Sequence, residues 1–486
     1  MSWVLPLFVL IPVLGALLVI TARHDSQKVI NWLAALTTGV TMVLATALYY
    51  VRAFNQLIVF DAGSLLIMDG FSHLLVLLAN VIAFLLVIYS AQYFKNDQRL
   101  GRFYLLFLIM LAGINGVALA GNLMLMYIFI EMAALSAYAL VAFGHDRQSL
   151  EASFKYFILG EVASLFILAA IGMVFSATGT TDLFALAPKM ELMSNQVRQL
   201  VVVLFIAGLG MKAALVPFHF WLPDAHTTAP APISAILSGI IIKVLGIYAL
   251  ARIIINVIGL TPDVALILLV LGGLTILVGG FLAIVQWDMK RLMAYSSISQ
   301  VGYIVVGLSL GSPLGIMGAV FHLANHALMK PLLFLTAGAV EKEAGSRDLR
   351  ELGGLRKKMP LTFLGSLFGS LAISGVPPFN GFWSKVFIIF ACVQVGQNWL
   401  ALIGVIGGVL TMAAFLKIQQ YVFFGPVKNE SVKEAPVAIC FPIIVLALAC
   451  LIIGITFPLF IDKFINPAVV ALANRTGFGR MIMGGL

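Results

Sequence analysis

Residues 208–235 read GLGMKAALVPFHFWLPDAHTTAPAPISA, and this segment combines features of a membrane helix with features that interrupt one. It is apolar enough for a membrane helix, yet it contains Lys212 and, five residues later, Pro217. Proline removes a backbone donor and clashes with the preceding turn, so we expect the helix to break near Pro217. The negative end of the first half-helix then favours a charged Lys212, whereas burial disfavours the charge. The segment therefore predicts a lysine that gains and loses a proton.

The composition is that of a polytopic membrane protein. Of the 486 residues, 62% are hydrophobic and 10% are charged, whereas soluble domains are about half apolar and a quarter charged. The three cysteines, Cys392, Cys440 and Cys450, lie in apolar runs and form no CxxC pair. We therefore expect neither a disulfide framework nor a metal site.

An apolar run of about 20 residues can cross a bilayer as a helix. The first run lacks a basic n-region and a cleavage site, so we expect a retained span rather than a signal peptide. The predicted fold is an all-α membrane protein with about fourteen spans. They lie near 2–21, 29–50, 70–93, 103–120, 123–143, 152–177, 198–220, 231–257, 262–286, 292–310, 313–340, 361–393, 397–424 and 437–460.

The basic residues predict the orientation. Loops after odd-numbered spans hold sixteen lysines and arginines, and the opposite loops, Arg252 included, hold seven. Cytoplasmic loops carry the excess of positive charge, so both termini are expected outside. This distribution along loops also argues against a nucleic-acid partner.

Six further basic residues fall within or at the edge of predicted spans, and all six are lysines. An arginine would stay charged, whereas a buried lysine can lose its proton. This set therefore suits proton transfer better than fixed ion pairing. Its members are Lys155, Lys212, Lys243, Lys330, Lys385 and Lys417.

An internal repeat is visible in the chain. VPFHFW at 216–221 is similar to VPPFNGFW at 376–383, which places Pro217 and Pro377 160 positions apart and predicts a second helix break at Pro377 and Pro378. Lys155 and Lys330 lie 175 positions apart, and the matches pair spans 6, 7 and 8 with spans 11, 12 and 13. An offset of five spans reverses the topology, as in transporters built from inverted repeats; chance similarity of two apolar stretches is the alternative.

The repeat predicts four units along the chain. Residues 1–100 hold spans 1–3, and residues 426–486 hold span 14 and the C-terminal tail. Residues 101–260 (spans 4–8) and 261–425 (spans 9–13) form two inverted five-helix repeats, with helices 7 and 12 broken.

Glu131 lies in the middle of span 5, in MYIFIEMAALSAYAL. Since no basic residue lies within a turn of it, its partner must come from another span, and Lys212 is the obvious candidate. Ionisable groups at this depth are functional sites by default. A purely structural buried pair is the alternative.

His322 and His326 are four positions apart in FHLANHALMK, so they share one helical face, with Lys330 one turn further on. Histidine titrates near neutral pH, which suits a relay between spans 8 and 12. A structural histidine pair and a metal site are the alternatives. The metal is disfavoured because the adjacent glutamate of HExxH and a third ligand are missing.

Other ionisable groups are accessory candidates. Lys155 is expected to pair with Glu151 at i and i+4 near the interface, and Glu161 lies deeper without an assigned role. Lys330 and Lys417 are the other in-span candidates, and His219, Asp224 and His226 are predicted to be either the mouth of a pathway or loop anchors. Asp288, Lys290 and Arg291 indicate a loop anchor on the cytoplasmic side. The sequence contains no nucleotide-binding loop and no cysteine cluster for iron–sulfur binding.

Four segments are similar to signatures of one family. They are KAALVPFHFWLPDAHTTAPAPISAILSG, DMKRLMAYSSISQVGY, HLANHALMKPLLFL and SGVPPFNGFWSK, which together cover spans 7–12. The chain resembles the antiporter-like membrane subunits shared by respiratory complex I, membrane-bound hydrogenases and Mrp-type cation/proton antiporters.

The resemblance implies a proton pathway. Glu131 resembles the family's span 5 glutamate, Lys212 its lysine partner and Lys243 the connecting lysine of span 8. His322 and His326 resemble the span 11 relay, and Lys385 the terminal residue of span 12, where some members carry glutamate. The long lateral helix of the largest members is absent, which indicates one of the shorter subunits.

The leading hypothesis is a proton-translocating subunit of a redox-driven complex, either complex-I-like or a membrane-bound hydrogenase. No cofactor is expected in this chain, and iron–sulfur, nickel–iron or flavin centres are expected only in partner subunits. The alternatives are a subunit of an Mrp-type sodium/proton antiporter and an inert assembly scaffold. The expected location is a prokaryotic cytoplasmic membrane, beside other membrane subunits and peripheral redox subunits.

Overall fold

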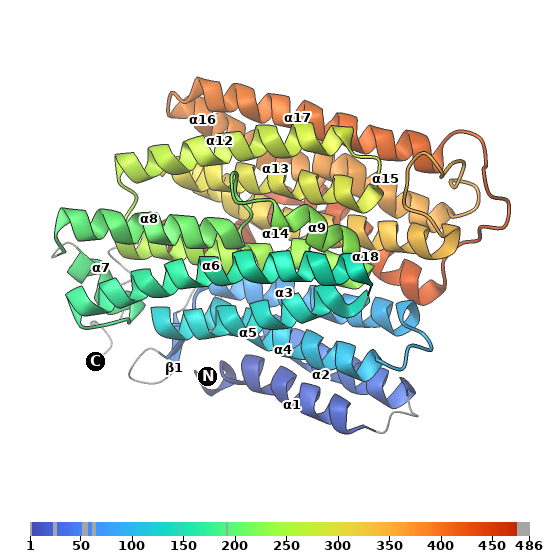
Figure 1. The fold of residues 1–486 in the computed structure, drawn as a ribbon. Helices are drawn as coiled ribbons and strands as arrows, with labels where there is room; N and C mark the ends of the chain where they lie inside the picture. The colour runs from blue at the N-terminus through green and yellow to red at the C-terminus, as the bar shows by residue number, and fades with distance from the viewer. Residues whose placement is uncertain are drawn as a thin grey trace.

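A computed structural model describes residues 2–22, 27–50, 57–60, 65–144, 146–190 and 193–473. The described chain is almost entirely helical, and its long helices lie roughly parallel to one another (Figure 1). One small antiparallel hairpin, β1 (Ile58–Phe60) with β2 (Leu66–Met68), departs from the expected all-α fold. Val59 pairs with Ile67 in its register.

Twelve helices of the described chain are long and apolar enough to cross a membrane. The eleven built around one α-helix are α1 (Leu7–Thr21) with η1 (Ser2–Val4), α2 (Gln27–Tyr50), α3 (Gly70–Tyr93), α4 (Leu100–Leu119), α5 (Leu123–Val141) with η3 (Ala142–Gly144), α6 (Arg147–Thr178), α12 (Pro262–Val285), α13 (Met289–Ser309), α14 (Pro313–Ala344), α17 (Asn398–Ile418) with η7 (Gln419–Phe423), and α18 (Val437–Ile455). The twelfth runs through α10 (Ala231–Ile236), the π-helix η5 (Leu237–Tyr248), α11 (Ala249–Ala251) and the π-helix η6 (Arg252–Ile258). Short helices complete the described chain: α7 (Leu183–Lys189), α9 (Trp221–Thr228), α19 (Phe457–Phe460), η8 (Ile461–Ile465) and α20 (Asn466–Ala473).

The other two expected spans are interrupted. In the first, α8 (Asn195–Lys212) ends at Lys212, and helix resumes only at α9. In the second, α15 (Pro360–Ser374) is separated from α16 (Asn380–Gln394) by a turn. Both interruptions contain a cis X–Pro bond, at Val216–Pro217 and Pro377–Pro378. Twelve uninterrupted helices and two broken ones match the fourteen apolar runs of the sequence.

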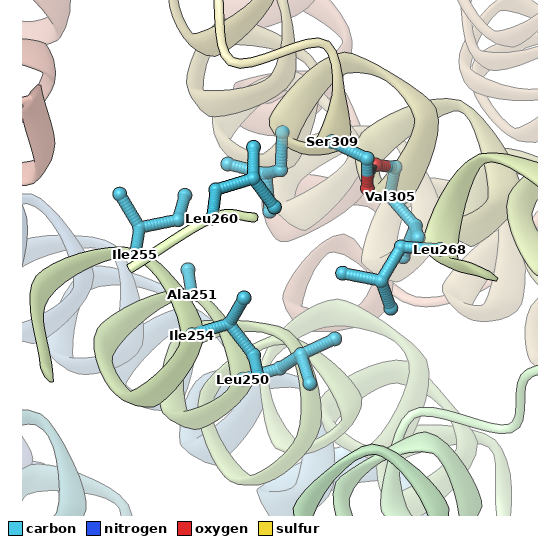
Figure 2. A pocket seen from close by; sticks show the side chains of 9 residues that line it. Leu250, Ala251, Ile254, Ile255, Leu260, Leu268, Val305 and Ser309 are labelled. Atoms are coloured by element: carbon cyan, nitrogen blue, oxygen red, sulfur yellow. Dashed lines mark hydrogen bonds between the residues drawn. The ribbon is translucent and has the colours of Figure 1, made fainter. Parts of the chain in front are cut away.

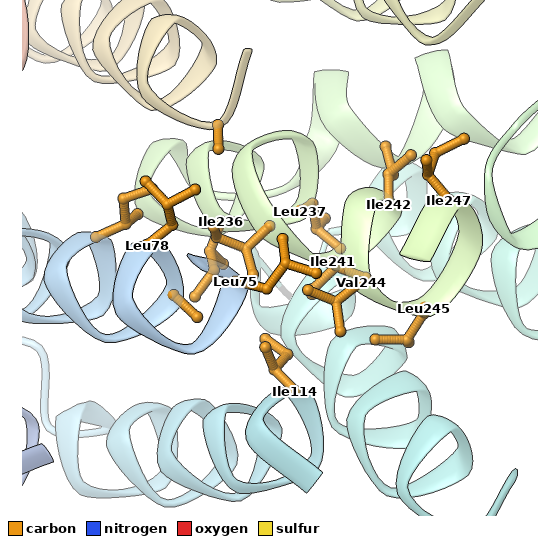
Figure 3. Close-up of a cluster of buried hydrophobic side chains, with 14 of the residues drawn as sticks. Leu75, Leu78, Ile114, Ile236, Leu237, Ile241, Ile242, Val244, Leu245 and Ile247 are labelled. Atoms are coloured by element: carbon orange, nitrogen blue, oxygen red, sulfur yellow. The ribbon is translucent and has the colours of Figure 1, made fainter. Parts of the chain in front are cut away.

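Two helices form the enclosed centre of the molecule, the α10–η6 helix and α14, because their apolar windows are buried throughout. α14 packs against α10, α13, α15, α16 and α18. Figure 3 shows the apolar packing around the α10–η6 helix, with Leu75 and Leu78 of α3 and Ile114 of α4 turned toward Ile236 and Ile241. Lys243 lies on the α10–η6 helix, and His322, His326 and Lys330 lie on α14. These residues therefore occupy the two least accessible helices.

Some backbone features recur at a spacing of 166 positions, whereas the inversion of the two repeats stays a prediction. α6 and α14 are both 32 residues long, and both end at a left-handed glycine, Gly179 and Gly345. The bridge between Asn122 and Asp182 recurs between Asp288 and Asp348. In this register Lys330 corresponds to Ser164, so the 175-position match of Lys155 with Lys330 lies outside it.

Candidate functional site

The first helix break brings Glu131 and Lys212 together. Lys212 is the last residue of α8, and its Nζ lies 3.6 Å from Glu131 Oε1 in the middle of α5. Ser164 of α6 donates a hydrogen bond to the same carboxylate oxygen. The break is held by Val216 N, which donates to Thr275 Oγ1 at 3.1 Å. The carboxylate and amine that the sequence pairs are therefore within ion-pairing distance.

The two members of the pair differ in their exposure. The side chain of Lys212 is 4% exposed, whereas that of Glu131 is 17% exposed, so the amine lies further inside than the carboxylate. Lys212 Nζ also lies 3.4 Å from Tyr138 Oη. Glu161, which the sequence left without a role, has a buried Oε1 that accepts no hydrogen bond from the described chain.

The second break positions Lys385 differently. Its Nζ donates to Ile373 O at 2.7 Å, at the C-terminal end of α15, and lies 5.0 Å from the centre of the Tyr303 ring. Gly375, at φ +82°, lets the lysine chain pass, because a Cβ there would approach Lys385 Cδ to 3.1 Å. Lys385 itself lies near the start of α16, so the carbonyl that its amine contacts belongs to the preceding half-helix. The amines of Lys212 and Lys385 thus both lie near C-terminal, electronegative helix ends.

The two histidines of α14 lie beside Lys385. His322 Nδ1 is 2.9 Å from Oγ of Ser384, the residue next to Lys385, and the His322 and His326 ring centroids are 6.2 Å apart. Neither ring nitrogen of His326 has a hydrogen-bond partner among the described residues. Within that part of the chain no group of three His, Cys, Asp or Glu side chains is arranged to hold a metal ion.

Lys243 and Lys330 are fully buried. Lys330 contacts α13 directly, and Lys243 contacts it through Ser238. Lys330 Nζ donates to Met293 O at 2.7 Å and to Ser296 Oγ at 2.6 Å. Lys243 Nζ donates to the carbonyl of Ser238, and the Ser238 hydroxyl lies 2.8 Å from that of Ser297. α13 therefore connects the two central lysines through a short polar segment, 293–297.

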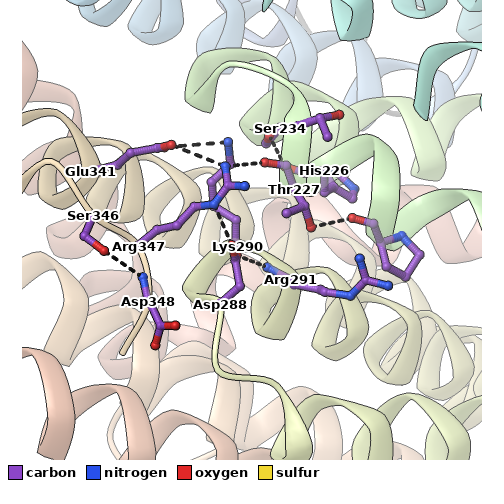
Figure 4. A network of polar contacts seen from close by, with 12 residues as sticks. His226, Thr227, Ser234, Asp288, Lys290, Arg291, Glu341, Ser346, Arg347 and Asp348 are labelled. Carbon is purple, nitrogen blue, oxygen red and sulfur yellow. Dashed lines mark hydrogen bonds and ion pairs between the residues drawn. The ribbon is translucent and has the colours of Figure 1, made fainter. Parts of the chain in front are cut away.

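A polar network covers the end of the molecule that carries the basic loops (Figure 4). Asp288 caps α13 by accepting from Arg291 N at 2.9 Å and pairs with Arg347 Nε at 2.5 Å, as expected for a loop anchor. Lys290 differs from that expectation because it is buried: its Nζ donates to Ala229 O at 2.6 Å and lies 3.7 Å from Glu341.

His219 and His226 both lie below the surface. His226 is completely buried, stacks on Phe334 at 4.9 Å, and has no hydrogen-bond partner for either ring nitrogen within the described ranges. His219 is 4% exposed and lies against Phe220, with ring centroids 4.4 Å apart. The ring of His226 therefore forms no hydrogen bond to a loop within the described ranges.

Lys155 and Lys417 lie apart from the buried row. Lys155 is half exposed, and its Nζ is 2.8 Å from Glu151 and 3.3 Å from Asp224, beside a polar cavity of about 270 Å³. Lys417 donates to Gln286 O at 2.8 Å, near the C-terminal end of α12, and lies 3.7 Å from the ring centre of Trp287. Their place as accessory groups of a pathway stays a prediction.

Sequence reasoning missed a buried ion pair. Arg252 was counted among loop residues, but it lies in η6, is 1% exposed and pairs with Asp69, which caps α3. Arg252 also donates to Ser72 Oγ at 3.1 Å. The basic residues inside the spans are therefore not all lysines. The available signal was the position of Arg252 inside the apolar run 231–257.

A separate hollow lies between η6, α12 and α13 (Figure 2). Its lining side chains, which include Leu250, Ile254, Leu268 and Val305, are apolar except for Ser309. Because no titratable side chain lines this hollow, it is not part of the row of ionisable residues from Glu131 to Lys385.

Known proteins are similar to this chain in sequence and in fold. The family described as NADH:quinone oxidoreductase/Mrp antiporter, TM, matches residues 120–411. NADH-quinone oxidoreductase subunit N of Desulforudis audaxviator is 34% identical over 427 residues, covering 84% of this chain and 85% of that protein. A Na(+)/H(+) antiporter subunit of Alkalihalophilus pseudofirmus is 31% identical over 482 residues, covering 95% and 97%. A chain of the membrane-bound sulfane sulfur reductase, an archaeal respiratory membrane complex, superposes with a TM-score of 0.88 at 29% identity, covering 98% and 99%.

Proposed function

The chain belongs to the NADH:quinone oxidoreductase/Mrp antiporter transmembrane family, and we propose that it is a proton-translocating subunit of a redox-driven membrane complex, complex-I-like or of the hydrogenase type. The observation that carries this proposal is the ion pair between Glu131 and Lys212 at the first helix break. Intramembrane ionisable residues that face the protein interior mark proton relays.

The ion pair supplies a proton-release step. While Glu131 is ionised, its charge offsets part of the desolvation of the Lys212 ammonium. When Glu131 takes up a proton, that attraction disappears and the buried lysine is left beside backbone dipoles alone. Lys212 then releases its proton toward the protein interior, where Lys243 lies on the enclosed α10–η6 helix.

The second half of the row carries the proton onward. Lys243 and Lys330 are connected through the polar segment of α13. His326 and His322 follow on α14, and the contact of His322 with Ser384 leads to Lys385 at the second break. The proposed order is Glu131, Lys212, Lys243, the two histidines and Lys385, with Lys330 and Glu161 as accessory groups.

The surroundings of the subunit belong to the same proposal. The chain is a multi-pass membrane protein with bacterial and archaeal relatives. We place it in the cytoplasmic membrane with both termini outside, because the loops after odd-numbered spans carry most of the positive charge. Partner subunits would supply the iron–sulfur, nickel–iron or flavin centres and the electron transfer that drives transport.

The second candidate is a subunit of an Mrp-type sodium/proton antiporter. It is favoured by the match with the Alkalihalophilus antiporter protein, which extends over 95% of the chain. Purification of the native complex separates the two candidates. Co-purified redox subunits, and proton transport that starts only when an electron donor is added, support the leading proposal. Sodium-driven proton transport without redox subunits supports the second.

The residue roles are tested by Glu131→Gln in the assembled complex. Glutamine keeps the shape and the hydrogen bond from Ser164 but removes the charge, so we expect proton transport to fall by at least about tenfold, equivalent to about 1.4 kcal/mol. Glu151→Gln is the matched control, because Glu151 forms an exposed pair with Lys155 on α6. Equal transport in Glu131→Gln and wild type would refute the role of the pair.

A further inference from the structure

A second row of buried polar groups lies between α13 and α17. On α13, Ser296, Gln300 and Tyr303 follow at spacings of four and three, which places them on one helical face. On α17 and η7, Thr411 and Gln419 are separated by two turns, about 12 Å along the axis. The two helices pack against each other, and α15 packs against α17. Ser296 and Tyr303 contact lysines of the relay, whereas Gln300, Thr411 and Gln419 have no place in the relay described above.

The end of the row near the basic loops is formed by Gln419. It is 5% exposed and lies one turn from Phe423, where Arg356 N of the basic loop donates to Phe423 O at 3.1 Å. Gln419 Nε2 donates to Ser370 Oγ at 2.8 Å and to Ser366 Oγ at 3.0 Å, both on α15. Gln419 Oε1 is buried and accepts no hydrogen bond from the described chain.

The deeper end is formed by Gln300. It is fully buried, and its Nε2 donates to Thr411 Oγ1 at 3.2 Å. Its Oε1 is also without a protein donor among the residues that the structure describes. Buried amide oxygens are nearly always hydrogen-bonded to protein or to ordered water. Two such oxygens in one helical seam therefore indicate water at two depths.

Lys330 lies between the two glutamines. Its Nζ contacts Met293 and Ser296, one to two turns into α13 from the end that carries the basic loops. The same Nζ is 5.8 Å from the ring centre of Phe415, which lies between Thr411 and Gln419 on α17. The lysine amine therefore faces the seam where the two unpaired oxygens occur.

We propose that the seam between α13, α15 and α17 is a water-filled inlet that connects the side of the basic loops with Lys330 through Gln419, Ser366 and Ser370. Gln300 and Thr411 extend the same route toward Tyr303, whose ring lies below Lys385. The second half of the relay thus has its own supply of protons, and their transfer to Lys385 still requires the Glu131–Lys212 pair to open. This inference rests on the proposed function of the chain as a proton-translocating subunit.

The first test measures access of water-sized ions. Ser366→Cys is made in a chain whose three cysteines are replaced by alanine, and sealed vesicles of either orientation are exposed to Ag⁺. The blocked fraction of the introduced thiol is found by alkylating the remainder after denaturation and analysing the peptide by mass spectrometry. We expect blocking from the side of the basic loops and none from the opposite side.

Ala83→Cys provides the matched control, because Ala83 is equally buried but lies on α3, which is not one of the three helices of the seam. It is expected to stay unblocked. No blocking of Ser366→Cys from the basic-loop side, or equal blocking of the two introduced thiols, overturns the inlet.

The second test measures proton transport in the assembled complex. Gln419→Leu removes one water-binding group, so the rate is expected to fall about tenfold, the equivalent of one hydrogen bond. Gln420→Leu, one position further and exposed, is expected to transport like wild type.

Glu131→Gln is measured in the same vesicles and separates the two proposals. If Glu131→Gln blocks transport and Gln419→Leu does not, the inlet fails while the proposed function stands. If both variants transport normally, both fail. If Gln419→Leu does not assemble, blocking of Ser366→Cys decides the question alone.

Discussion

The two broken spans each place a lysine amine beside the C-terminal end of a half-helix, but they balance its charge in different ways. At the first break, Lys212 lies 3.6 Å from the carboxylate of Glu131. At the second, Lys385 donates to the carbonyl of Ile373 and lies over the ring of Tyr303, and no acidic side chain of the described chain lies within ion-pairing distance of it. The first break therefore holds an ion pair, and the second holds an amine beside dipoles.

Within the proposed function, this difference gives different tasks to the two halves. An ion pair in a poorly solvated site must be broken before its proton moves, so the first break works as a gate that opens when Glu131 is neutralised. An amine balanced only by dipoles has no partner to lose, so the second break works as a receiving group. The predictions below compare how the two lysines respond to equivalent substitutions.

The largest effect is expected for Lys212→Met. The substitution leaves the Glu131 carboxylate without its cation, and an uncompensated buried charge costs about 3–5 kcal/mol. Proton transport should be lost, and the midpoint of thermal unfolding of the purified complex should fall clearly. An unchanged unfolding midpoint would show that the two side chains do not stabilise each other.

Lys385→Met should separate transport from stability. Transport should again be lost, because the terminal amine is gone. The free energy of unfolding should change by about 1–2 kcal/mol, since one hydrogen bond to a backbone carbonyl and one contact with the Tyr303 ring disappear. If Lys385→Met destabilises the complex as strongly as Lys212→Met, the second break also holds an ion pair and the comparison fails.

A smaller effect is expected for His326→Leu. His326 is fully buried and lies between the central lysines and His322. Removing a proton-transferring side chain should lower transport by at least about tenfold, while folding is largely kept because leucine fills a similar volume. Transport at the wild-type rate would make His326 a packing residue, and the inlet at Gln419 would then load Lys385 without it.

The smallest effects are expected for Lys417→Met and Lys155→Met. Lys417 contributes a helix-end contact and a cation–π contact, together worth about 1 kcal/mol. Lys155 forms exposed pairs, which contribute little. Both variants should transport within twofold of wild type. If either variant loses as much proton transport as Lys385→Met does, the substituted lysine belongs to the pathway. The distinction between buried and exposed lysines would then fail.

Much of the architecture was predictable because a bilayer leaves few choices. Apolar length identified the spans, and proline chemistry identified both interruptions. The contact of Glu131 with Lys212 was predictable because a carboxylate in the middle of a span needs a cation from elsewhere. Each of these inferences depends on a local pattern or on a large desolvation energy.

Other features depend on contacts that a single sequence does not contain. The position of Arg252 within a span was visible in the sequence, but its ion pair was not, because Asp69 lies 183 positions away at the start of another helix. The dipole at Lys385 comes from the preceding half-helix. Gln300 and Gln419 are neutral, so a search for ionisable residues in the spans does not find them. Sequence patterns therefore identified the charged residues proposed for the relay, whereas their neutral surroundings became visible only in three dimensions.

The account depends most on the release of a proton by Lys212, and Lys212→Arg tests it directly. Arginine keeps the positive charge beside Glu131 but does not deprotonate in proteins. The measurement is proton translocation by the assembled complex, with Lys155→Arg as the control. We predict that both variants assemble like wild type and that only Lys212→Arg fails to translocate protons. Translocation at the wild-type rate by Lys212→Arg would contradict the account.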